Sequence, residues 1–410
     1  MRTPVVEDTV STLVAPAGHP PLRSAARERG RNQFLWFYAA IAGSLLLRFS
    51  LFGFESGDYR AFIGPWYDFL VEHGRWHGLG QLKEDFCSYP PLYMYLVSLS
   101  TLLPLPKLFA LKLIPLASDY VAAWFVWRLA RKHISSARKR WAAVTLFLFL
   151  PTVVMNSALW GQCDVMYAGA FLASLYYLLE RRWIAAMVAF GVAISLKPQA
   201  IFWCPLLAGL LLSRRLPWRI LWIAPAVYAA SDIPAMLAGR PVLDVLLHWG
   251  RVHNIQGKMT FGATNWYQWV FENHPGVFEP AGIILALIAT VFLALWMMDG
   301  PRPGQDERRW VVSMALLSVT MVPFVLPGMH ERYFFAADVL SVVYAFYVPG
   351  GWIIAVMVQF CSAFSYLPYL FNEEPVPRWA LALVMLLAIG GIVKNQVEAG
   401  DRVCAERSNL

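Results

Sequence analysis

Apolar runs of about 17–25 residues recur along nearly the whole of this 410-residue chain. A helix of about 20 apolar residues, rising about 1.5 Å per residue, is just long enough to cross the hydrocarbon core of a bilayer. Only 15% of the residues are charged, against about 25% in an ordinary soluble domain. The runs therefore predict an all-α, polytopic helical membrane protein. Because a surface that faces lipid needs no polar side chains, a single membrane domain can use most of the chain.

The basic residues, which give a formal net charge of +8, lie in short clusters between the apolar runs. That arrangement is typical of residues that orient membrane helices, and it argues against a nucleic-acid partner. The cysteines are scattered, without a CxxC motif or a metal-ligand spacing, at Cys87, Cys163, Cys204, Cys361 and Cys404. They predict neither a disulfide nor a zinc site.

The arginines that precede the first apolar run set the expected orientation of the chain. Residues 1–33 are polar and rich in arginine, so they are predicted to form a cytoplasmic tail. The run at 34–53 is too long for the hydrophobic region of a signal peptide, and no convincing cleavage site follows it. It is expected to remain as a membrane helix, which places the loop 55–90 on the outer face. A second cytoplasmic tail is expected at 396–410.

The basic cluster at 128–140 is expected on the cytoplasmic face, although two apolar stretches separate it from the first outer loop. If both stretches crossed the membrane, the cluster would lie outside. The stretch 91–104 is short and bounded by prolines, so we interpret it as a dipping or juxtamembrane helix. The full crossing is then 108–130.

The remaining apolar runs continue this alternation within a single membrane domain, 34–395, of about twelve crossings (11–13) with a second large outer loop at 238–279. These crossings are expected near 141–158, 163–180, 183–197, 200–213, 218–237, 280–298, 310–327, 331–348, 351–370 and 376–394. With this topology the unusual polar motifs fall together on the outer face. Their clustering predicts an active site there.

The first polar motif is "GDYRAFIGPWYDFL", directly after the first apolar run. From Tyr59 to Leu70 the apolar residues recur at helical spacing, which predicts an amphipathic helix lying in the outer interface. Asp58 stands just before this helix. It has two compatible interpretations, a helix N-cap and a general base at the membrane surface.

Two further motifs contain polar residues beside turns. In "DFCSYPPLYMYL", Asp85 and Tyr89 flank a rigid proline turn or form a wall of an acceptor cleft. In "NSALWGQCD", Trp160, Gln162 and Asp164 form a polar turn or grip sugar hydroxyls.

In "SLKPQ", Lys197 and Gln199 lie at a helix end. The lysine either extends to the membrane interface or provides a cation for a lipid-linked phosphate.

The last motif, "LPGMHERYFF", places His330, Glu331 and Arg332 in a row between two apolar helices. Such residues are costly at a membrane boundary unless they are solvated or paired. They form either a solvated turn with a Glu–Arg pair or an anion site in which Arg332 grips phosphate. Within the apolar stretch 108–130, Asp119 and Lys112 lie seven residues apart on one face and are expected to form an internal polar pair.

Taken together, "GDY", "YPPLYMY", "ALWGQCD", "LKPQ" and "HER", in this order over residues 34–345, resemble the GT-C class of polyprenyl-phosphate-sugar-dependent glycosyltransferases. They look most like bacterial mannosyltransferases related to the GPI second mannosyltransferase. The first loop is also similar to that of dolichyl-phosphate-glucose glucosyltransferases. The resemblance implies an inverting enzyme with Asp58 as catalytic base and with the His330–Arg332 motif near the donor phosphate. In this chain Ser88, not aspartate, precedes "YPP", and the nearest acid is Asp85.

The resemblance implies a sugar, most simply mannose, moving from a polyprenyl phosphate to a hydroxyl of a glycan, lipid or protein acceptor. The reaction would take place on the outer face of a bacterial inner or plasma membrane, or of the endoplasmic reticulum membrane in a eukaryote. The leaving phosphate needs fixed positive charge, for which Arg332, His330 and Lys197 are the candidates. No carboxylate cluster indicates a divalent metal, and none is assigned. The open alternatives are a glucose donor, a lipid-glycan ligase, and a polytopic transporter or flippase.

Overall fold

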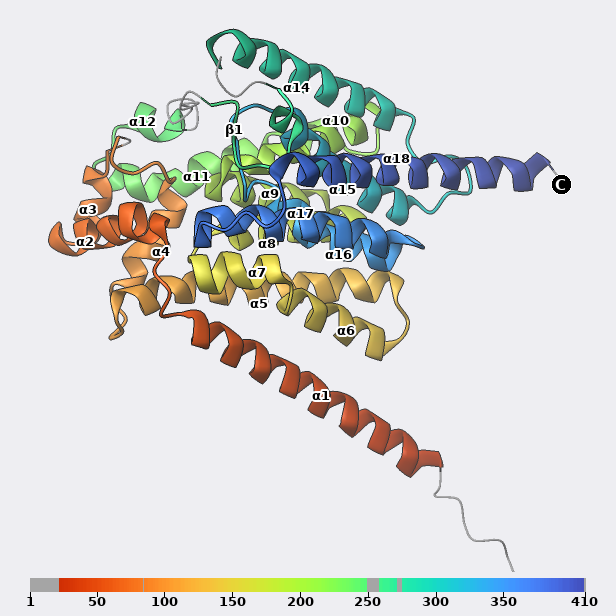
Figure 1. Ribbon diagram of the computed structural model, residues 1–410, viewed down its shortest axis with the longest axis horizontal. Helices are drawn as coiled ribbons and strands as arrows, with labels where there is room; N and C mark the ends of the chain where they lie inside the picture. Colours follow the sequence, from red (N-terminus) through yellow and green to blue (C-terminus); the bar gives the residue numbers. More distant parts are fainter. Residues whose placement is uncertain (1–21, 84, 249–257, 271–274, 409–410) are drawn as a thin grey trace, which may run out of the picture. The chain divides into compact units, whose positions relative to one another are not determined.

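The computed structural model describes residues 22–83, 85–248, 258–270 and 275–408 (Figure 1). The chain divides into two compact units, residues 1–43 and residues 44–410. The described part of the smaller unit is the first portion of helix α1 (Leu22–Leu51). Much of the predicted tail 1–33 therefore lies outside the described residues.

Long apolar helices make up most of the larger unit, as the apolar runs predict. Six of the described helical segments are long and apolar enough to span a bilayer. They are α5 (Lys107–His133), η4 (Trp218–Ile220) with α11 (Ile223–Leu237), α14 (Pro275–Met298), α15 (Glu307–Val325), α17 (Gly351–Phe371) and α18 (Arg378–Ser408). Helix α18 runs through the predicted boundary at residue 395 without a break.

A seventh candidate span is bent by 46° and combines α6 (Ala137–Leu148), α7 (Pro151–Val154) and the π-helix η2 (Met155–Trp160). Pro151 lies at the break, where its missing N–H and fixed φ interrupt the helical hydrogen bonds. The shorter apolar segments include α8 (Asp164–Leu179), α9 (Trp183–Leu196), η3 (Pro198–Trp203) with α10 (Cys204–Leu212), and α16 (Phe335–Tyr347). The all-α membrane architecture is confirmed, while the number of about twelve crossings stays a prediction.

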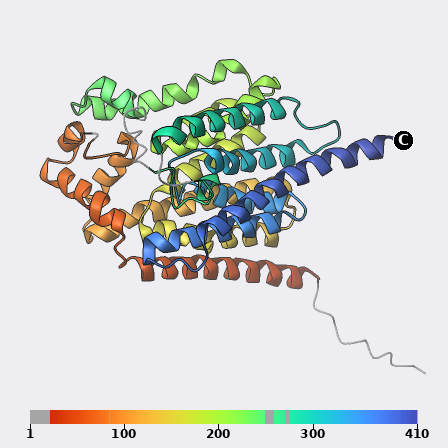
Figure 2. The same cartoon turned by 45° about the horizontal axis from the view of Figure 1, so that its top comes forward.

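Figure 2 shows the helices of the larger unit side by side. Helix α8 packs against α5, α9 and α16. Almost all of its side chains are buried. Gly169 allows α5 to approach closely, because a Cβ at this position would lie 3.3 Å from Cβ of Ala122. Asp164, the first residue of α8, is consequently buried inside protein.

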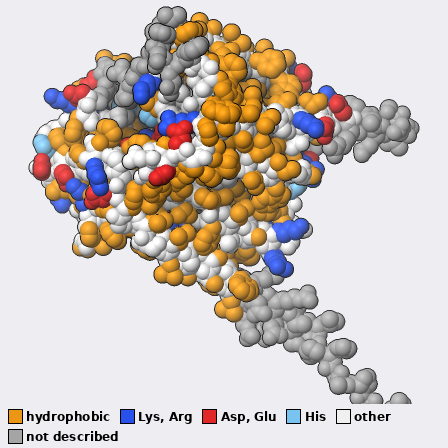
Figure 3. Space-filling view, in the orientation of Figure 1, with side chains coloured by type: hydrophobic (Ala, Val, Ile, Leu, Met, Phe, Trp, Pro, Cys, Tyr) orange, Lys and Arg blue, Asp and Glu red, His pale blue; other side chains and the backbone are white. Residues whose placement is uncertain are grey.

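Large apolar side chains cover much of the outer surface of the bundle (Figure 3). Helix α14 shows this most clearly, since Ile284, Leu287, Ile288 and Phe292 are each more than half exposed. A monomer in water rarely exposes contiguous apolar surface of this kind. The pattern is that of helices whose outer faces contact lipid.

The first loop folds into short helices, as its amphipathic pattern predicts. The π-helix η1 (Tyr59–Ile63) continues into α2 (Gly64–Glu72), and α3 (Trp76–Gln81) and α4 (Pro91–Ser100) follow. Ile63, Trp66 and Leu70 are buried on one face, whereas Arg60 and Asp68 are exposed. Helix α4 has ten residues, so it is about 15 Å long, half the thickness of a bilayer core.

The second large loop contributes α12 (Val242–Leu246), η5 (Trp266–Gln268) and strand β1 (Thr260–Phe261). Strand β1 pairs in parallel with β2 (Met329–His330), with Phe261 opposite His330. This short strand pairing fixes the backbone at His330, the first residue of the "HER" motif. Residues 249–257 and 271–274 of the predicted loop lie outside the described part of the chain.

The expected pair between Asp119 and Lys112 is wrong. Oδ2 of Asp119 instead accepts a 2.8 Å bond from Nε of Arg48 and a 2.6 Å bond from Oγ of Ser157, and all three side chains are buried. Seven residues separate Asp119 from Lys112 by about 10 Å along the helix axis. They share a face without contact, and the partners come from neighbouring segments.

Candidate functional site

The carboxylate of Asp58 is the centre of a buried group of hydrogen bonds. Its Oδ2 atom accepts bonds from Nε1 of Trp160, at 3.0 Å, and from Nε2 of Gln162. Its Oδ1 atom accepts a 2.5 Å bond from the hydroxyl of Tyr369. Asp58 is only 7% exposed, so three neutral donors hold a negative charge that little water reaches.

Asp58 does not cap the helix that follows it, so that interpretation is wrong. Its backbone is already helical, with φ −64° and ψ −36°, and its side chain makes no cap bond. The hydroxyl of Ser56 accepts the N–H of Tyr59 at 3.2 Å instead. Ser56 therefore acts as the N-cap, two residues earlier, and leaves the carboxylate of Asp58 free for other contacts.

Two glycines make the close packing around Asp58 possible. At Gly57 a Cβ would lie 3.0 Å from the hydroxyl of Tyr369, so a larger residue there would disturb the bond to Asp58. Gly161 has φ +79°, a conformation that glycine adopts without strain. The turn at Gly161 ends η2 and brings the donors of Trp160 and Gln162 to the same carboxylate oxygen.

The side chains of Trp160 and Gln162 are buried, at 0% and 2% exposure. They donate to Asp58 and do not form an exposed surface for sugar hydroxyls. The hydroxyl of Tyr89 donates to Oε1 of Gln162 at 3.1 Å, which directs the amide N–H of Gln162 towards Asp58. Burial raises the pKa of Tyr89 well above its usual value, so its hydroxyl stays protonated as a donor.

The amine of Lys112 joins the segment that carries Asp58 to the segment that carries Trp160 and Gln162. Nζ of Lys112 lies within hydrogen-bond distance of the backbone oxygens of Leu51 (3.3 Å), Phe52 (3.1 Å), Phe54 (2.6 Å) and Leu159 (3.0 Å). The first three oxygens belong to the last residue of α1 and to the turn after it, just before Asp58. Leu159 immediately precedes the tryptophan that donates to Asp58.

Arg332 lies among three carboxylates. Its Nη1 atom is 3.0 Å from Oε1 of Glu331 and 3.6 Å from Oδ2 of Asp58, and its Nε atom is 3.9 Å from Oδ2 of Asp164. The guanidinium also lies over the ring of Trp160, 5.3 Å from its centre. Because Glu331 is 5% exposed and the Arg332 side chain 12%, a solvated Glu–Arg turn is ruled out.

The pKa values around Arg332 follow from burial and from these pairings. Burial alone would lower the pKa of Arg332, but the carboxylates of Asp58 and Glu331 raise it well above its usual value. Burial raises the pKa of Glu331, against the opposing effect of Arg332. Burial, with smaller contributions from Arg332 and Lys197, lowers the pKa of His330 to about 3. His330 is therefore neutral at physiological pH, and its assignment to the donor phosphate stays a prediction.

The carboxylate of Asp164 is also fully paired. Its Oδ1 atom forms an ion pair with Nζ of Lys197, and its Oδ2 atom accepts a 2.9 Å bond from Nδ2 of Asn156. Asp164 and Lys197 are 0% and 4% exposed, so Lys197 does not extend to the membrane interface. Gln199, two residues further on, is also buried, and its Oε1 atom has no partner among the described residues.

The structure thus brings together most of the predicted site residues and leaves Asp85 outside the group. Asp85 is exposed and lines a separate pocket. Tyr369 is the residue that sequence reasoning missed. It lies in the apolar helix α17, 311 residues from Asp58, where a tyrosine has no local signal of function. A small cavity of about 220 Å³ opens beside Tyr369 and Glu331, and Arg378 also lines it.

A protein-family model and a solved structure are similar to this chain. The model of glycosyltransferase family 87 matches residues 86–327, more than half of the chain. No curated protein matches the chain. The crystal structure of ArnT from Cupriavidus metallidurans, bound to undecaprenyl phosphate, is similar with a TM-score of 0.53 and 15% sequence identity. The similarity covers 89% of this chain and 78% of that one.

The structural likeness confirms the predicted GT-C-like polytopic membrane fold. The matched region contains Trp160, Gln162, Asp164 and Lys197, whereas Asp58 lies before it. From its sequence, the chain belongs to glycosyltransferase family 87.

Proposed function

We propose that this glycosyltransferase moves a sugar from a polyprenyl-phosphate donor to an acceptor hydroxyl, with inversion, and that Asp58 is its general base. The observation that carries the proposal is the buried carboxylate of Asp58, held by three donors with a guanidinium beside it. The fold is similar to that of a protein solved with undecaprenyl phosphate, which supports a lipid-phosphate donor.

The hydrogen bonds of Asp58 indicate which of its oxygens takes the proton. Oδ2 already accepts two bonds, from Trp160 and Gln162, so both of its in-plane acceptor positions are used. Oδ1 accepts one bond, from Tyr369, and keeps a second position. We therefore assign Oδ1 as the base atom; Tyr369, which donates to it, lines the small cavity.

The proposed transfer is a single displacement. The acceptor hydroxyl gives its proton to Oδ1 of Asp58 as its oxygen forms a bond to the anomeric carbon of the donor. The bond from that carbon to the phosphate oxygen breaks on the opposite face, and the phosphate leaves with the electron pair. A carboxylate within hydrogen-bond reach of the hydroxyl is the main requirement of this step.

The leaving phosphate gains negative charge, which fixed cations stabilise. We assign this role to Arg332 and Lys197, whose charges are held near Asp58 by the surrounding carboxylates. His330 is neutral and would contribute a hydrogen bond. The group holds three acids, Asp58, Asp164 and Glu331, and Arg378 provides a further cation in the cavity beside Glu331.

The sugar, the membrane and the face of the membrane are part of the proposal. Mannose is the sugar that the motif resemblance favours, with glucose as the second candidate. The membrane is proposed to be a bacterial inner or plasma membrane, with the site on the outer face. A glycan, lipid or protein hydroxyl would act as the acceptor.

The test is transfer by the purified protein in lipid nanodiscs. Undecaprenyl phosphate carrying labelled mannose, or labelled glucose, would be supplied with a membrane lipid extract as the source of acceptor. We expect label to move from the mannose donor into a new product and free undecaprenyl phosphate to appear in equal amount. Donor that remains intact in every combination, with protein shown to be folded, would contradict the proposal.

A further inference from the structure

Tyr89 is the residue through which the end of the first loop reaches the proposed base. Its hydroxyl donates to Oε1 of Gln162, and Gln162 donates to Oδ2 of Asp58. Nζ of Lys197 lies 5.7 Å from the centre of the Tyr89 ring. The position of Tyr89 therefore affects both the carboxylate that is proposed to take the proton and a cation that is proposed to bind the phosphate.

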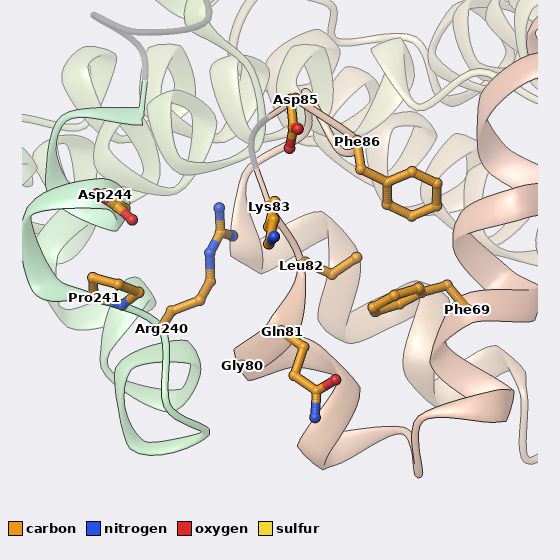
Figure 4. Close-up of a pocket in the computed structure, with 10 residues that line it drawn as sticks. All are labelled: Phe69, Gly80, Gln81, Leu82, Lys83, Asp85, Phe86, Arg240, Pro241 and Asp244. Carbon is orange, nitrogen blue, oxygen red and sulfur yellow. The ribbon is translucent and has the colours of Figure 1, made fainter.

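This end of the first loop faces residues 231–248, which comprise the end of α11, helix α12 and the connection between them. We call these residues the α11–α12 segment. Figure 4 shows the two walls on opposite sides of a pocket of about 830 Å³, with Leu82 and Phe86 on one side and Arg240 and Asp244 on the other. Because the pocket separates these walls, contacts elsewhere hold the segment and the loop together.

His248, at the end of the α11–α12 segment, contacts the residue before Tyr89. Its Nε2 atom lies 3.2 Å from the backbone oxygen of Ser88. Burial, with a smaller effect of the charge of Arg240, lowers the pKa of His248 to about 4, so the ring is neutral at physiological pH. Since a carbonyl oxygen can only accept a hydrogen bond, Nε2 carries the proton and donates to Ser88.

Tyr95, on helix α4, makes a second contact with the segment. Its hydroxyl donates to the backbone oxygen of Ser231 at 3.0 Å and accepts the N–H of Ala235 at 2.9 Å. In a regular α-helix this N–H and this oxygen would bond to each other, because they are four residues apart. The hydroxyl is therefore inserted into the hydrogen bonds of α11, beside Pro234, whose missing N–H already leaves one helical bond unmade.

A further contact depends on a glycine at the end of α3. A Cβ at Gly80 would overlap the backbone oxygen of Ala238, so a larger residue would push the two backbones apart. The α11–α12 segment thus touches the first loop at residues 80, 88 and 95, on both sides of Tyr89. Within the loop, the ring of Tyr89 also packs against the rings of Trp66 and Tyr93. Those partners belong to the same loop, so they do not by themselves fix Tyr89 relative to Gln162.

The α11–α12 segment has internal contacts that hold its own shape. The N–H of Arg240 donates to the backbone oxygen of Ala235 at 3.0 Å, and the hydroxyl of Tyr228 donates to the backbone oxygen of Val245 at 3.2 Å. Asp232 and Arg240 are both buried, and their opposite charges partly compensate each other. The segment can therefore serve as a fixed support for the first loop.

We propose that the α11–α12 segment fixes the position of Tyr89, and that His248 and Tyr95 are positioning residues for the proposed base. Both act on Asp58 through Tyr89 and Gln162. The effect on sugar transfer rests on the proposed function, whereas the effect on the position of Tyr89 does not.

Two substitutions of His248 form a matched pair. His248→Phe keeps a buried ring and loses the donor, whereas His248→Gln can place an amide N–H near the position of Nε2. In the nanodisc assay we expect His248→Phe to lower kcat about tenfold, with little change in the KM for the donor. His248→Gln should recover much of the rate. The control is His73→Phe, which removes a 2.8 Å contact with the backbone oxygen of Phe69 inside the first loop and should leave kcat unchanged.

Tyr95→Phe tests the second contact. It removes one hydroxyl and allows Ala235 and Ser231 to bond to each other directly, so α11 should stay folded. We expect kcat to fall by a similar factor, about tenfold, with little loss of stability.

A double-mutant cycle with Tyr89→Phe separates positioning from general damage. If His248 acts through the hydroxyl of Tyr89, His248→Phe should lower kcat no further in a Tyr89→Phe background. A purely structural role of His248 would lower the activity by the same factor in both backgrounds. Equal factors in the two backgrounds would therefore overturn the inference.

The position of Tyr89 can also be followed without any transfer. Fluorotyrosine at position 89 of the full-length protein in nanodiscs reports the surroundings of the ring by fluorine NMR. The signal should shift or split in His248→Phe and Tyr95→Phe, and it should keep its wild-type position in His248→Gln and His73→Phe.

An unchanged signal in His248→Phe and Tyr95→Phe overturns the inference, as does a wild-type kcat in both variants of an active enzyme. If the signal shifts as expected but the wild-type protein transfers no sugar, the proposed function fails while the support of Tyr89 by the α11–α12 segment stands.

Discussion

The hydroxyl of Tyr369 lies 2.5 Å from Oδ1 of Asp58, although 311 residues separate the two in the chain. The bond joins α17, one of the last helices, to the first loop. It leaves Oδ1 with one free acceptor position. The position of the proposed base therefore depends on a residue that belongs to none of the polar motifs.

Tyr369→Phe should lower the turnover rate while the protein stays folded. A hydrogen bond to a charged group contributes about 1.5–3 kcal/mol, which corresponds to about 10–100-fold in rate if the bond acts fully in the transition state. The measurement is kcat and KM for the donor in the nanodisc assay. Tyr366→Phe is the matched control, since Tyr366 lies on the same helix and bonds Asp338 at 3.2 Å. Equal rates in the two variants would show that the Tyr369 bond is incidental.

Lys112 is predicted to act as a positioning residue. Replacing it with methionine leaves the carbonyl groups of Leu51, Phe52, Phe54 and Leu159 without a shared donor. Misplacement of a catalytic group by about 1 Å can cost about 100-fold in rate. We expect Lys112→Met to lower kcat about 10–100-fold with little change in the KM for the donor.

The controls for Lys112 separate position from general damage. Lys107→Met, on the same helix, removes a partly exposed pair with Asp68 and should change kcat little. Lys112→Arg supplies donors again and should restore part of the rate. A melting temperature that falls while kcat is unchanged would mean that Lys112 stabilises the fold only.

Arg332→Lys should weaken use of the donor in a normally folded protein. The planar guanidinium reaches Glu331, Asp58 and Asp164 from one position, which a lysine amine cannot do. We expect the KM for the donor to rise about tenfold or kcat to fall by a similar factor. Arg181→Lys, in an exposed pair with Glu307, is the control. Wild-type kinetics in Arg332→Lys would remove this residue from the donor site.

The neutral state of His330 predicts a pH dependence of stability. Its pKa is about 3 in the folded protein and about 6.5 in the unfolded chain. Between these values the unfolded chain binds more protons, so this residue makes stability fall as the pH drops from about 6.5 towards 3. The pKa of Glu331 is raised by folding. At pH values above the usual pKa of a glutamate, the folded state therefore binds more protons at this residue, and its contribution makes stability rise as the pH drops.

His330→Gln removes the contribution of the histidine to the pH dependence of stability and leaves the contribution of Glu331. Melting temperatures of the wild type and of this variant should differ in slope below about pH 6.5 and run parallel above it. Parallel curves over the whole range would show that His330 titrates normally in the folded protein.

Much of the helical architecture could be predicted because apolar length is a local property. The stretch 310–327, for example, appears as α15 from Glu307 to Val325. Asp58, Asp164 and Lys197 could also be found, since a charged residue at the end of an apolar run is costly without a function or a partner.

The partners of these residues could not be predicted, because they are set by packing between distant segments. Arg48 takes the place of Lys112 beside Asp119, and nothing in either local sequence distinguishes the two bases. Tyr369 looks like any aromatic residue of an apolar helix. The surroundings of Arg240 include a wall that comes from the first loop, far away in the chain.

The central claim is that Asp58 takes the proton from the acceptor, and Asp58→Asn tests it most directly. The variant keeps the size of the side chain, and since Asp58 makes no cap bond, the helix that follows should be unaffected. The measurement is the rate of labelled sugar transfer, with donor binding and melting temperature recorded on the same preparation. We predict a loss of about 10²–10⁴-fold in rate with normal stability and donor binding, and a near-normal rate for Asp85→Asn. An active Asp58→Asn beside an inactive Asp85→Asn would contradict the account and move the base to Asp85.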